Sequence, residues 1–299
     1  MTRDECIREC QRKANQTGRP QVFQDCFGFK TEIVWPSKPI LYLTGATTPS
    51  EREVSRHGNL GLLVTPDSRI ERHIGSHPAG FAVDNGMFGL AKRHQEAKFD
   101  QERFYRWLDT LPRTALFVAA PDVLHFIALQ DGEEVPVGDA AATLVQYPVH
   151  ARRIRAMGFK VALVGQDGIE ALLDEIPWDL VDAIFLGGSD AWKLGPGAKA
   201  LIDQAKLRGC HVHMGRVNSF ARLQLAQDLG CDTADGTFIT YGGDINVWRL
   251  QGWISDLRMT AGHFTEYTAL NNYNPFAIVH RLRERARREQ RTHTRQEAK

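Results

Sequence analysis

The stretch VALVGQDGIEALLDEIPWDLVDAIFLGG, residues 161–188, decides the fold. It begins and ends with the apolar runs Val161–Val164 and Ala183–Leu186, in which no polar residue alternates with the apolar ones. Such runs are typical of strands that are buried on both faces. A segment of helical period, Ile169–Glu175, separates them. The stretch therefore predicts a strand, a helix and a second strand parallel to the first.

The same alternation extends outward in both directions. Further apolar runs occur at Ile40–Gly45, Leu60–Thr65, Phe81–Asp84, Ala115–Ala120 and His211–Met214. Further helical segments are expected at Gln101–Leu111, Ala140–Met157, Ala198–Leu207, Ser219–Leu229 and Ile245–Leu257. About seven or eight such repeats favour an α/β fold of the closed, TIM-like (β/α)8 barrel type. An open, doubly wound sheet is the alternative, but no GxGxxG segment follows the first strand.

Three parts are expected along the chain. Residues 1–38 form an N-terminal extension, with a polar helix at Thr2–Gln16 followed by the mixed segment Gln21–Trp35. Residues 39–275 form the barrel, and residues 276–299 form a basic C-terminal helix with eight Arg or Lys against three Glu. Such a basic segment suits contact with phosphates, and equally suits a solvated terminal helix.

Composition bounds the class of protein. The 299 residues are 42% hydrophobic and 24% charged, with a formal net charge of +1, which excludes a polycation and a wholly disordered chain. We expect no membrane span and no secretory leader, because no apolar run is long enough and the N-terminus has no apolar core. Five cysteines without a CxxC pair favour reduced thiols in the cytoplasm. A zinc site at Cys6, Cys10 and Cys26 is disfavoured for the same reason.

The carboxyl ends of barrel strands surround the active site, so residues at these ends are the candidates for chemistry. Acidic or amide side chains and glycines recur at strand ends that are otherwise apolar. An isolated Asp before a Gly is usually a turn residue, but several at one barrel mouth indicate a site. The segments are Asp84–Gly89, Ala120–Asp122, Val164–Gly168, Gly187–Gly188, Met214–Gly215 and Gly230–Asp235.

Taken together, these six segments resemble the tRNA-guanine transglycosylase superfamily, and most closely the phage enzymes that place 7-deazaguanines in DNA. The family's Asp-Ser-Gly-Gly-Phe-Gln segment is similar to Asp84–Gly89, and its Gly-x-Asp-x-Phe-Asp segment to Gly230–Asp235. The resemblance covers roughly residues 40–276. It implies exchange of guanine in DNA for a 7-deazaguanine base through a covalent intermediate, without a cofactor. The alternative polymer is tRNA.

The resemblance also implies a role for each matching residue. Asp235 would be the nucleophile and Asp84 the general acid and base, with Asp232 as a competing nucleophile. A carboxylate can trap the oxocarbenium-like sugar, and a second carboxyl group can manage the proton of the base. The base itself would be bound by Asn85, Phe88, Asp122, Gln166, the backbone of Gly187 and Gly188, and Met214.

Two departures from the family pattern change what is expected. No cysteine follows Cys231, so the zinc site of the tRNA enzymes is not expected. Lys193 stands where the family has Glu, and a lysine would repel a cationic aminomethyl substituent. The sequence therefore predicts a neutral incoming base such as 7-cyano-7-deazaguanine. Arg216, Lys193 and Arg222 are candidates, with the basic C-terminal segment, for contacts to the DNA backbone.

Other classes of function remain open at this stage. His211 and His213 share one face of a strand, a spacing used by metal-dependent barrel hydrolases. A catalytically silent DNA-binding protein is a second alternative, and a nucleoside hydrolase is a third, because water can replace the incoming base. Oligomeric state is not indicated by the sequence.

Overall fold

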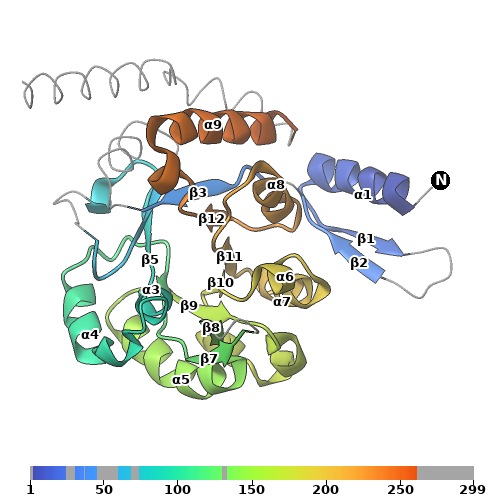
Figure 1. Ribbon diagram of the computed structural model, residues 1–299. Helices are drawn as coiled ribbons and strands as arrows, with labels where there is room; N and C mark the ends of the chain where they lie inside the picture. The colour runs from blue at the N-terminus through green and yellow to red at the C-terminus, as the bar shows by residue number, and fades with distance from the viewer. Residues whose placement is uncertain are drawn as a thin grey trace, which may run out of the picture.

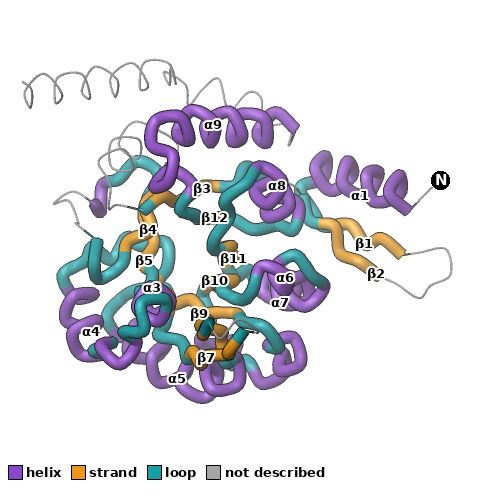
Figure 2. Tube along the Cα trace, in the orientation of Figure 1, coloured by secondary structure: helices purple, strands orange, loops and turns teal. Residues whose placement is uncertain are grey.

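Eight parallel strands close into a barrel (Figures 1 and 2). The computed structural model describes residues 3–24, 31–36, 38–45, 60–68, 74–129 and 133–260. Around the ring the strand order is β10-β11-β12-β3-β4-β5-β6-β9. The ring closes where β12 pairs with β3, with Asp235 opposite Leu43. The strands are β3 (Leu41–Thr44), β4 (Gly61–Val64), β5 (Phe81–Val83), β6 (Val118–Ala119), β9 (Val161–Gly165), β10 (Ala183–Leu186), β11 (His211–Met214) and β12 (Thr233–Asp235). The predicted (β/α)8 barrel is confirmed, and the open sheet is excluded.

Helices surround the ring of strands (Figure 2). They are α3 (Met87–Ala91), α4 (Gln101–Asp109), α5 (Ala140–Ala156), α6 (Asp190–Lys193), α7 (Pro196–Leu207), α8 (Phe220–Asp228) and α9 (Phe238–Thr260). Short 3-10 helices are η1 (Ile74–Ser76), η2 (Glu96–Lys98), η3 (Ile169–Glu175) and η4 (Trp178–Leu180). The η3 segment contains a kink at Leu172, where φ is −117° and ψ is 16°, so it is not the regular helix that its pattern suggested.

The strands have two apolar faces because each face meets a different part of the core. Alternate residues point into the barrel, where six of them form one cluster: Leu43, Leu63, Ala82, Phe117, Ala162 and Ala183. Their neighbours along the strands point outward and pack against the helices, as Val161, Leu163 and Ile184 do. Continuous apolar runs rather than alternating ones are the result.

The N-terminal extension forms a helix, α1 (Arg3–Thr17), and an antiparallel hairpin of β1 (Gln21–Gln24) and β2 (Thr31–Val34). The helix confirms the one predicted at residues 2–16. Trp35 joins the extension to the barrel, because its indole Nε1 donates a hydrogen bond of 2.7 Å to Asp203 of α7. The basic segment 276–299 and Cys26 lie outside the described residues.

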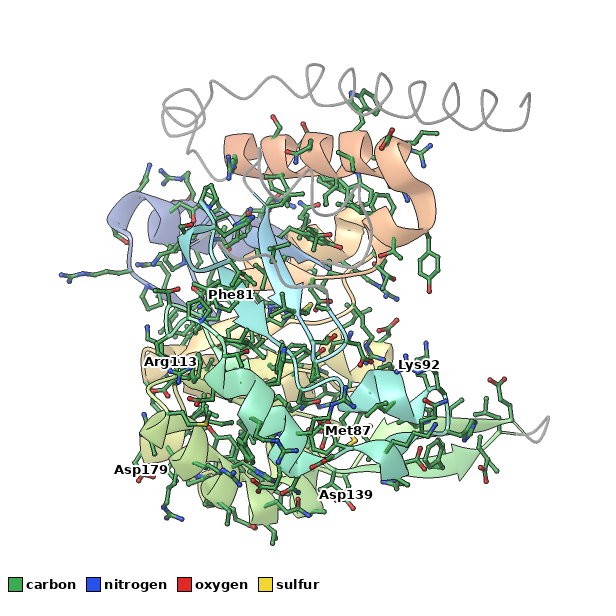
Figure 3. All side chains as sticks on the ribbon, turned by 90° about the vertical axis from the view of Figure 1, so that its left-hand side faces the viewer. Phe81, Met87, Lys92, Arg113, Asp139 and Asp179 are labelled. Carbon is green, nitrogen blue, oxygen red and sulfur yellow. The ribbon has the colours of Figure 1, made fainter. Side chains whose placement is uncertain are left out.

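A second hairpin was not predicted. It consists of β7 (Leu124–Ala128) and β8 (Glu134–Gly138), which pair antiparallel with Leu124 opposite Gly138. The hairpin lies in the long connection between β6 and α5, beyond the carboxyl end of β6. It projects from the body beside α3, near Met87 of this helix and Lys92 just after it, which are labelled in Figure 3. His94 stacks on Phe126 of β7 with ring centroids 5.2 Å apart, which fixes the hairpin against this side of the barrel mouth.

Within the described residues, no helix has the length and apolar character needed to span a bilayer.

Candidate active site

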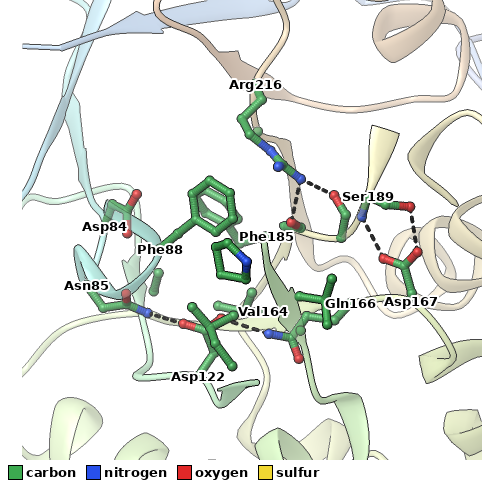
Figure 4. Close-up of a pocket in the computed structure, with 18 of the residues that line it drawn as sticks. Asp84, Asn85, Phe88, Asp122, Val164, Gln166, Asp167, Phe185, Ser189 and Arg216 are labelled. Carbon is green, nitrogen blue, oxygen red and sulfur yellow. Dashed lines mark hydrogen bonds between the residues drawn. The ribbon is translucent and has the colours of Figure 1, made fainter. Parts of the chain in front are cut away.

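A cavity of about 590 Å³ opens at the carboxyl ends of the barrel strands (Figure 4). Its lining includes eight of the nine residues that the sequence singled out: Asp84, Asn85, Phe88, Asp122, Gln166, Gly187, Gly188 and Asp235. These residues follow five different strands, so only barrel closure brings them together. The volume lies within the range of roughly 300–1,000 Å³ that is usual for small-molecule sites.

Met214 is the exception. Its side chain is 1% exposed and belongs to the core between strands and helices, not to the cavity lining. Because successive side chains of a strand point to opposite faces, the inward residue of β11 is the preceding one, His213. The expectation that Met214 covers a ring face of the base is therefore not supported by its position.

Asp235 ends β12 and points into the cavity. Its Oδ1 lies 2.9 Å from Nε2 of His213, an imidazole with no exposed surface. Oδ2 has no hydrogen bond to any residue in the described ranges. The competing Asp232 lies at the other end of the same strand, where both its carboxylate oxygens accept hydrogen bonds of 2.8 Å from Lys206. Of the two candidate nucleophiles, Asp235 lines the cavity and Asp232 does not.

Asp84 follows β5 at the start of a tight turn. Its Oδ1 accepts a hydrogen bond of 2.9 Å from the backbone of Gly86, which adopts φ +80° just before α3. Burial raises the pKa of Asp84, and the nearby charge of Asp235 raises it further. The raised pKa shifts this carboxyl group toward the protonated form, which is the form that a general acid needs.

Asp122 is held by two side-chain amides. Its Oδ1 accepts from Asn85 at 2.9 Å, and its Oδ2 accepts from Gln166 at 2.8 Å. Burial raises the pKa of Asp122 to about 6, against the opposing effect of the two amides. The remaining lone pairs of the carboxylate are available to a ligand that presents N–H groups.

The two amides have their other hydrogen-bonding atoms occupied by protein. Asn85 donates also to the carbonyl of Ala120 at 2.8 Å, and its Oδ1 accepts from the backbone of Met87 at 2.8 Å. Gln166 donates also to the carbonyl of Val123 at 3.2 Å, and its Oε1 accepts from Thr143 at 3.0 Å. The orientation of both amides is fixed by these contacts, so they position Asp122 and do not themselves present free donors.

Arg216 closes one side of the cavity. Its guanidinium donates to the carbonyls of Gly187 and Gly188 and lies 4.8 Å above the ring of Phe88. The backbone N–H groups of both glycines donate to Gly165, at 2.9 and 3.1 Å. The glycines thus line the cavity as expected, but their backbone groups already have protein partners. Arg216 has φ +61°, an unusual conformation for a side chain of this size.

Lys193 does not face the cavity. Its side chain is buried, with Nζ donating to the carbonyl of Gly215 at 2.6 Å and lying 3.2 Å from Asp190. Burial lowers its pKa to about 8. The expectation that Lys193 meets the substituent of the base is therefore corrected, since the cation among the lining residues is Arg216. Arg222 forms an ion pair of 2.8 Å with Asp190.

Three features of the site escaped sequence reasoning. The β7–β8 hairpin contributes a largely apolar wall to the cavity: Leu124, His125, Val135, Pro136, Val137 and Gly138. His213 points inward because side chains alternate along β11 and His213 pairs with Thr233 of β12. Thr233 lies two residues before Asp235 and so shares its face, and this alternation would have indicated the position of His213. The place of Arg216 depends on a left-handed backbone conformation, for which the sequence has no signal.

The pair His211 and His213 points into the barrel interior, but the two rings bond to one threonine. His211 Nε2 and His213 Nδ1 each lie 2.8 Å from Oγ1 of Thr233. Among the described residues, no group of three or more His, Cys, Asp or Glu side chains is arranged to hold a metal ion. This arrangement gives the metal-dependent hydrolase hypothesis no support.

No protein-family model matches the chain, and no curated protein matches its sequence. The functional assignment therefore depends on the chemistry of the cavity and on the motif resemblance described above.

Proposed function

We propose that this chain is a base-exchange transglycosylase, a pentosyltransferase that replaces guanine in DNA with a 7-deazaguanine base. The observation that carries the proposal is the placement of two carboxyl groups, Asp84 and Asp235, in one cavity. Their environments differ: burial raises the pKa of Asp84, whereas Asp235 accepts a hydrogen bond from His213 and has an oxygen free of hydrogen bonds to described residues. Two carboxyl groups in such different surroundings at one site suit an acid and a nucleophile.

In the first displacement, Oδ2 of Asp235 attacks C1′ of the deoxyribose. The C1′–N9 bond breaks as the proton of Asp84 passes to the departing guanine. The product is a covalent ester between Asp235 and the sugar, with Asp84 as a carboxylate. Atoms and charge balance without a cofactor.

The second displacement reverses these roles. The incoming 7-deazaguanine loses its N9 proton to Asp84, and N9 attacks C1′ while the bond to Asp235 breaks. Asp84 is again protonated and Asp235 is again a carboxylate, so the site returns to its starting state. Water in place of the base would give hydrolysis instead of exchange.

Asp122 recognises the base in this proposal. Guanine and 7-deazaguanines both present N1–H and an exocyclic amino group on one edge, and a carboxylate accepts from both. Phe88 lies along the cavity wall and provides a ring face for the planar base. The substituent at position 7 would be neutral, as in 7-cyano-7-deazaguanine, because Arg216 is among the lining residues and disfavours a cation.

DNA is the proposed polymer, on the basis of the resemblance, and tRNA is the alternative. The cavity accommodates one nucleotide rather than a duplex, so the target base must leave its stack before reaction. The proposed setting is the cytoplasm, where the nucleic acid and the free base are both present.

The test is mass spectrometry of nucleosides from cells that express the chain and are supplied with 7-cyano-7-deazaguanine. DNA and tRNA are digested separately, with Asp235→Asn as the inactive variant and Asp174→Asn, on the exposed surface of η3, as a matched control. We expect the modified deoxynucleoside in DNA with the wild type and Asp174→Asn, and none with Asp235→Asn. If only tRNA is modified, the assignment of DNA as the polymer is wrong. If neither nucleic acid is modified, the proposed function is wrong.

A further inference from the structure

A hydrogen-bonded chain of three side chains runs behind Asp235 inside the barrel. His211 Nε2 and His213 Nδ1 flank the hydroxyl of Thr233, each at 2.8 Å, and His213 Nε2 lies 2.9 Å from Oδ1 of Asp235. The chain crosses between neighbouring strands, because β11 supplies both histidines and β12 supplies Thr233 and Asp235. We propose that His213 is a positioning residue for Asp235, held in one tautomer by Thr233 and His211.

The chain has one consistent direction when His213 is neutral and Asp235 is ionised. A carboxylate only accepts, so Nε2 of His213 must carry the proton and donate to Oδ1. Nδ1 of His213 then has a lone pair, and the hydroxyl of Thr233 donates to it. The oxygen of Thr233 accepts in turn from Nε2–H of His211. Burial lowers the pKa of His211 to about 4, so that ring is neutral near pH 7 and has a single N–H for this contact.

Packing fixes the plane of the His213 ring. Its centroid lies 4.5 Å from that of Phe185 and 5.3 Å from that of Phe117, and the side chain has no exposed surface. The ring therefore cannot swing away from Asp235 without displacing the buried Phe117 or the half-buried Phe185. Both the plane and the tautomer of the imidazole are determined by the barrel interior.

Three consequences follow for Asp235. A fixed donor on Oδ1 sets the rotation of the carboxylate and leaves Oδ2 as the oxygen that faces the cavity. In the covalent intermediate, Oδ1 becomes the ester carbonyl and keeps the same hydrogen bond. When the ester breaks, the carboxylate charge returns and the bond strengthens, which favours departure of Asp235.

The far end of the chain reaches a second cavity. His211 also lines a space of about 410 Å³ at the amino-terminal end of the barrel, together with Lys206 and Asp232. The chain thus spans the barrel interior from that cavity to the candidate active site. Its side chains are buried or half-buried, and each polar atom named in it has a partner.

The expected effect of His213 on kcat rests on the proposed function, and steady-state kinetics of base exchange test it. His213→Leu removes the donor at similar volume, and we expect kcat to fall about 100-fold with KM changed less than about twofold. His213→Gln keeps a donor at the position of Nε2 and should recover about tenfold. Thr233→Val removes only the hydroxyl and should lower kcat about tenfold. Thr44→Val, at a buried threonine of β3 outside the chain, is the matched control and should leave kcat unchanged.

The tautomer is tested separately, because nitrogen-15 NMR of histidine-labelled full-length protein needs no activity. We expect His213 as the neutral Nε2–H tautomer in the wild type and in Asp235→Leu, where only Thr233 and His211 still act on the ring, and a mixture of tautomers when Thr233→Val is added to Asp235→Leu. An Nδ1–H tautomer or an imidazolium at pH 7.5 would overturn the positioning role, as would wild-type kcat in His213→Leu. If the wild type exchanges no base while the NMR result holds, the proposed function fails and the tautomer assignment stands.

Discussion

At the residue scale, Asp122 is a carboxylate whose orientation is fixed by two side-chain amides and whose pKa is raised by burial. Asn85 and Gln166 donate to its two oxygens, and each amide is locked by backbone partners. Burial acts against these contacts and raises the pKa to about 6. Under the proposed function, only the ionised form would accept from both N–H groups of a guanine edge, so recognition of the base would depend on pH in a range that is easily measured.

The corresponding prediction concerns the acid limb of the pH profile. As pH falls through about 6, Asp122 becomes protonated and loses an acceptor, so kcat/KM for base exchange should fall about tenfold per pH unit below that point. The measurement is the initial rate at low base concentration between pH 5 and 8. A profile that is flat between pH 5 and 7 would contradict the assignment of Asp122.

The raised pKa of Asp122 also makes the free energy of unfolding depend on pH, in a defined direction. The folded-state pKa of Asp122 lies above the ordinary 3.8, so the folded protein binds this proton more tightly than the unfolded chain does. The contribution of this group to folding is therefore full below about pH 4 and is lost as pH rises through about 6. Other carboxyl groups, such as Asp182 beside Arg155, have lowered pKa values and act in the opposite direction.

A second prediction at this scale concerns Arg216, whose guanidinium lies over Phe88 in the cavity wall. Arg216→Gln removes the cation while keeping hydrogen-bonding ability. The ratio of kcat/KM for an aminomethyl base to that for a cyano base should rise about tenfold, because like-charge repulsion is removed. Competition between the two bases measures this ratio. Arg208→Gln, at the opposite end of the barrel, should leave it unchanged, and an unchanged ratio in Arg216→Gln would exclude Arg216 from substituent selection.

At the scale of elements, the β7–β8 hairpin contacts the hydrogen-bond network around Asp122 through one glycine, Gly138. A Cβ at Gly138 would lie 2.4–2.7 Å from three carbon atoms of Gln166, too close for any stable contact. Gln166 has little freedom to move, since it is hydrogen-bonded to Thr143, Asp122 and Val123. The end of the hairpin therefore packs directly on the amide that orients Asp122.

Gly138→Ala should accordingly lower kcat/KM for base exchange by about 10- to 100-fold, through displacement of Gln166 and Asp122. Gly252→Ala in α9 is the matched substitution, because a Cβ there meets no atom within 4 Å. That variant should keep full activity and gain about 0.5–1 kcal/mol in free energy of unfolding. Denaturant unfolding measures the stability of both, and equal activity in the two variants would show that the hairpin does not constrain Gln166.

The elements also show where sequence reasoning stops. The barrel strands could be predicted because burial on both faces leaves apolar runs, and the strand ends then identified Asp84, Asp122, Gln166 and Asp235. The β7–β8 hairpin could not, because its strands are exposed or half-buried instead of buried on both faces, and one contains Pro136. Met214 was misplaced because successive side chains of a strand point to opposite faces, and the sequence does not say which of the two faces the barrel interior. Lys193 was misplaced because the backbone after β10 turns its side chain away from the cavity.

At the scale of the whole molecule, the N-terminal extension is attached to the barrel through a half-buried polar contact. Asp203 of α7 accepts from the indole of Trp35 at 2.7 Å and from Lys199 at 2.5 and 2.6 Å. Lys199 donates also to the carbonyl of Ile33 at 2.9 Å. Asp203 thus contacts both Trp35 and Lys199, the two residues whose hydrogen bonds join this part of the extension to α7.

Asp203→Ala should loosen the extension without changing the candidate active site. The substitution leaves the Trp35 indole without its acceptor and the Lys199 ammonium with the carbonyl of Ile33 alone, which should cost about 1–3 kcal/mol in free energy of unfolding. Limited proteolysis should cleave within residues 1–36 faster than in the wild type, while base exchange per folded molecule stays unchanged, because Asp203 does not line the cavity. Asp174→Ala, on the exposed surface of η3, is the control for loss of a carboxylate. Cleavage at the wild-type rate would show that apolar packing of Trp35 alone holds the extension, whereas a loss of exchange would show that the extension contributes to the site.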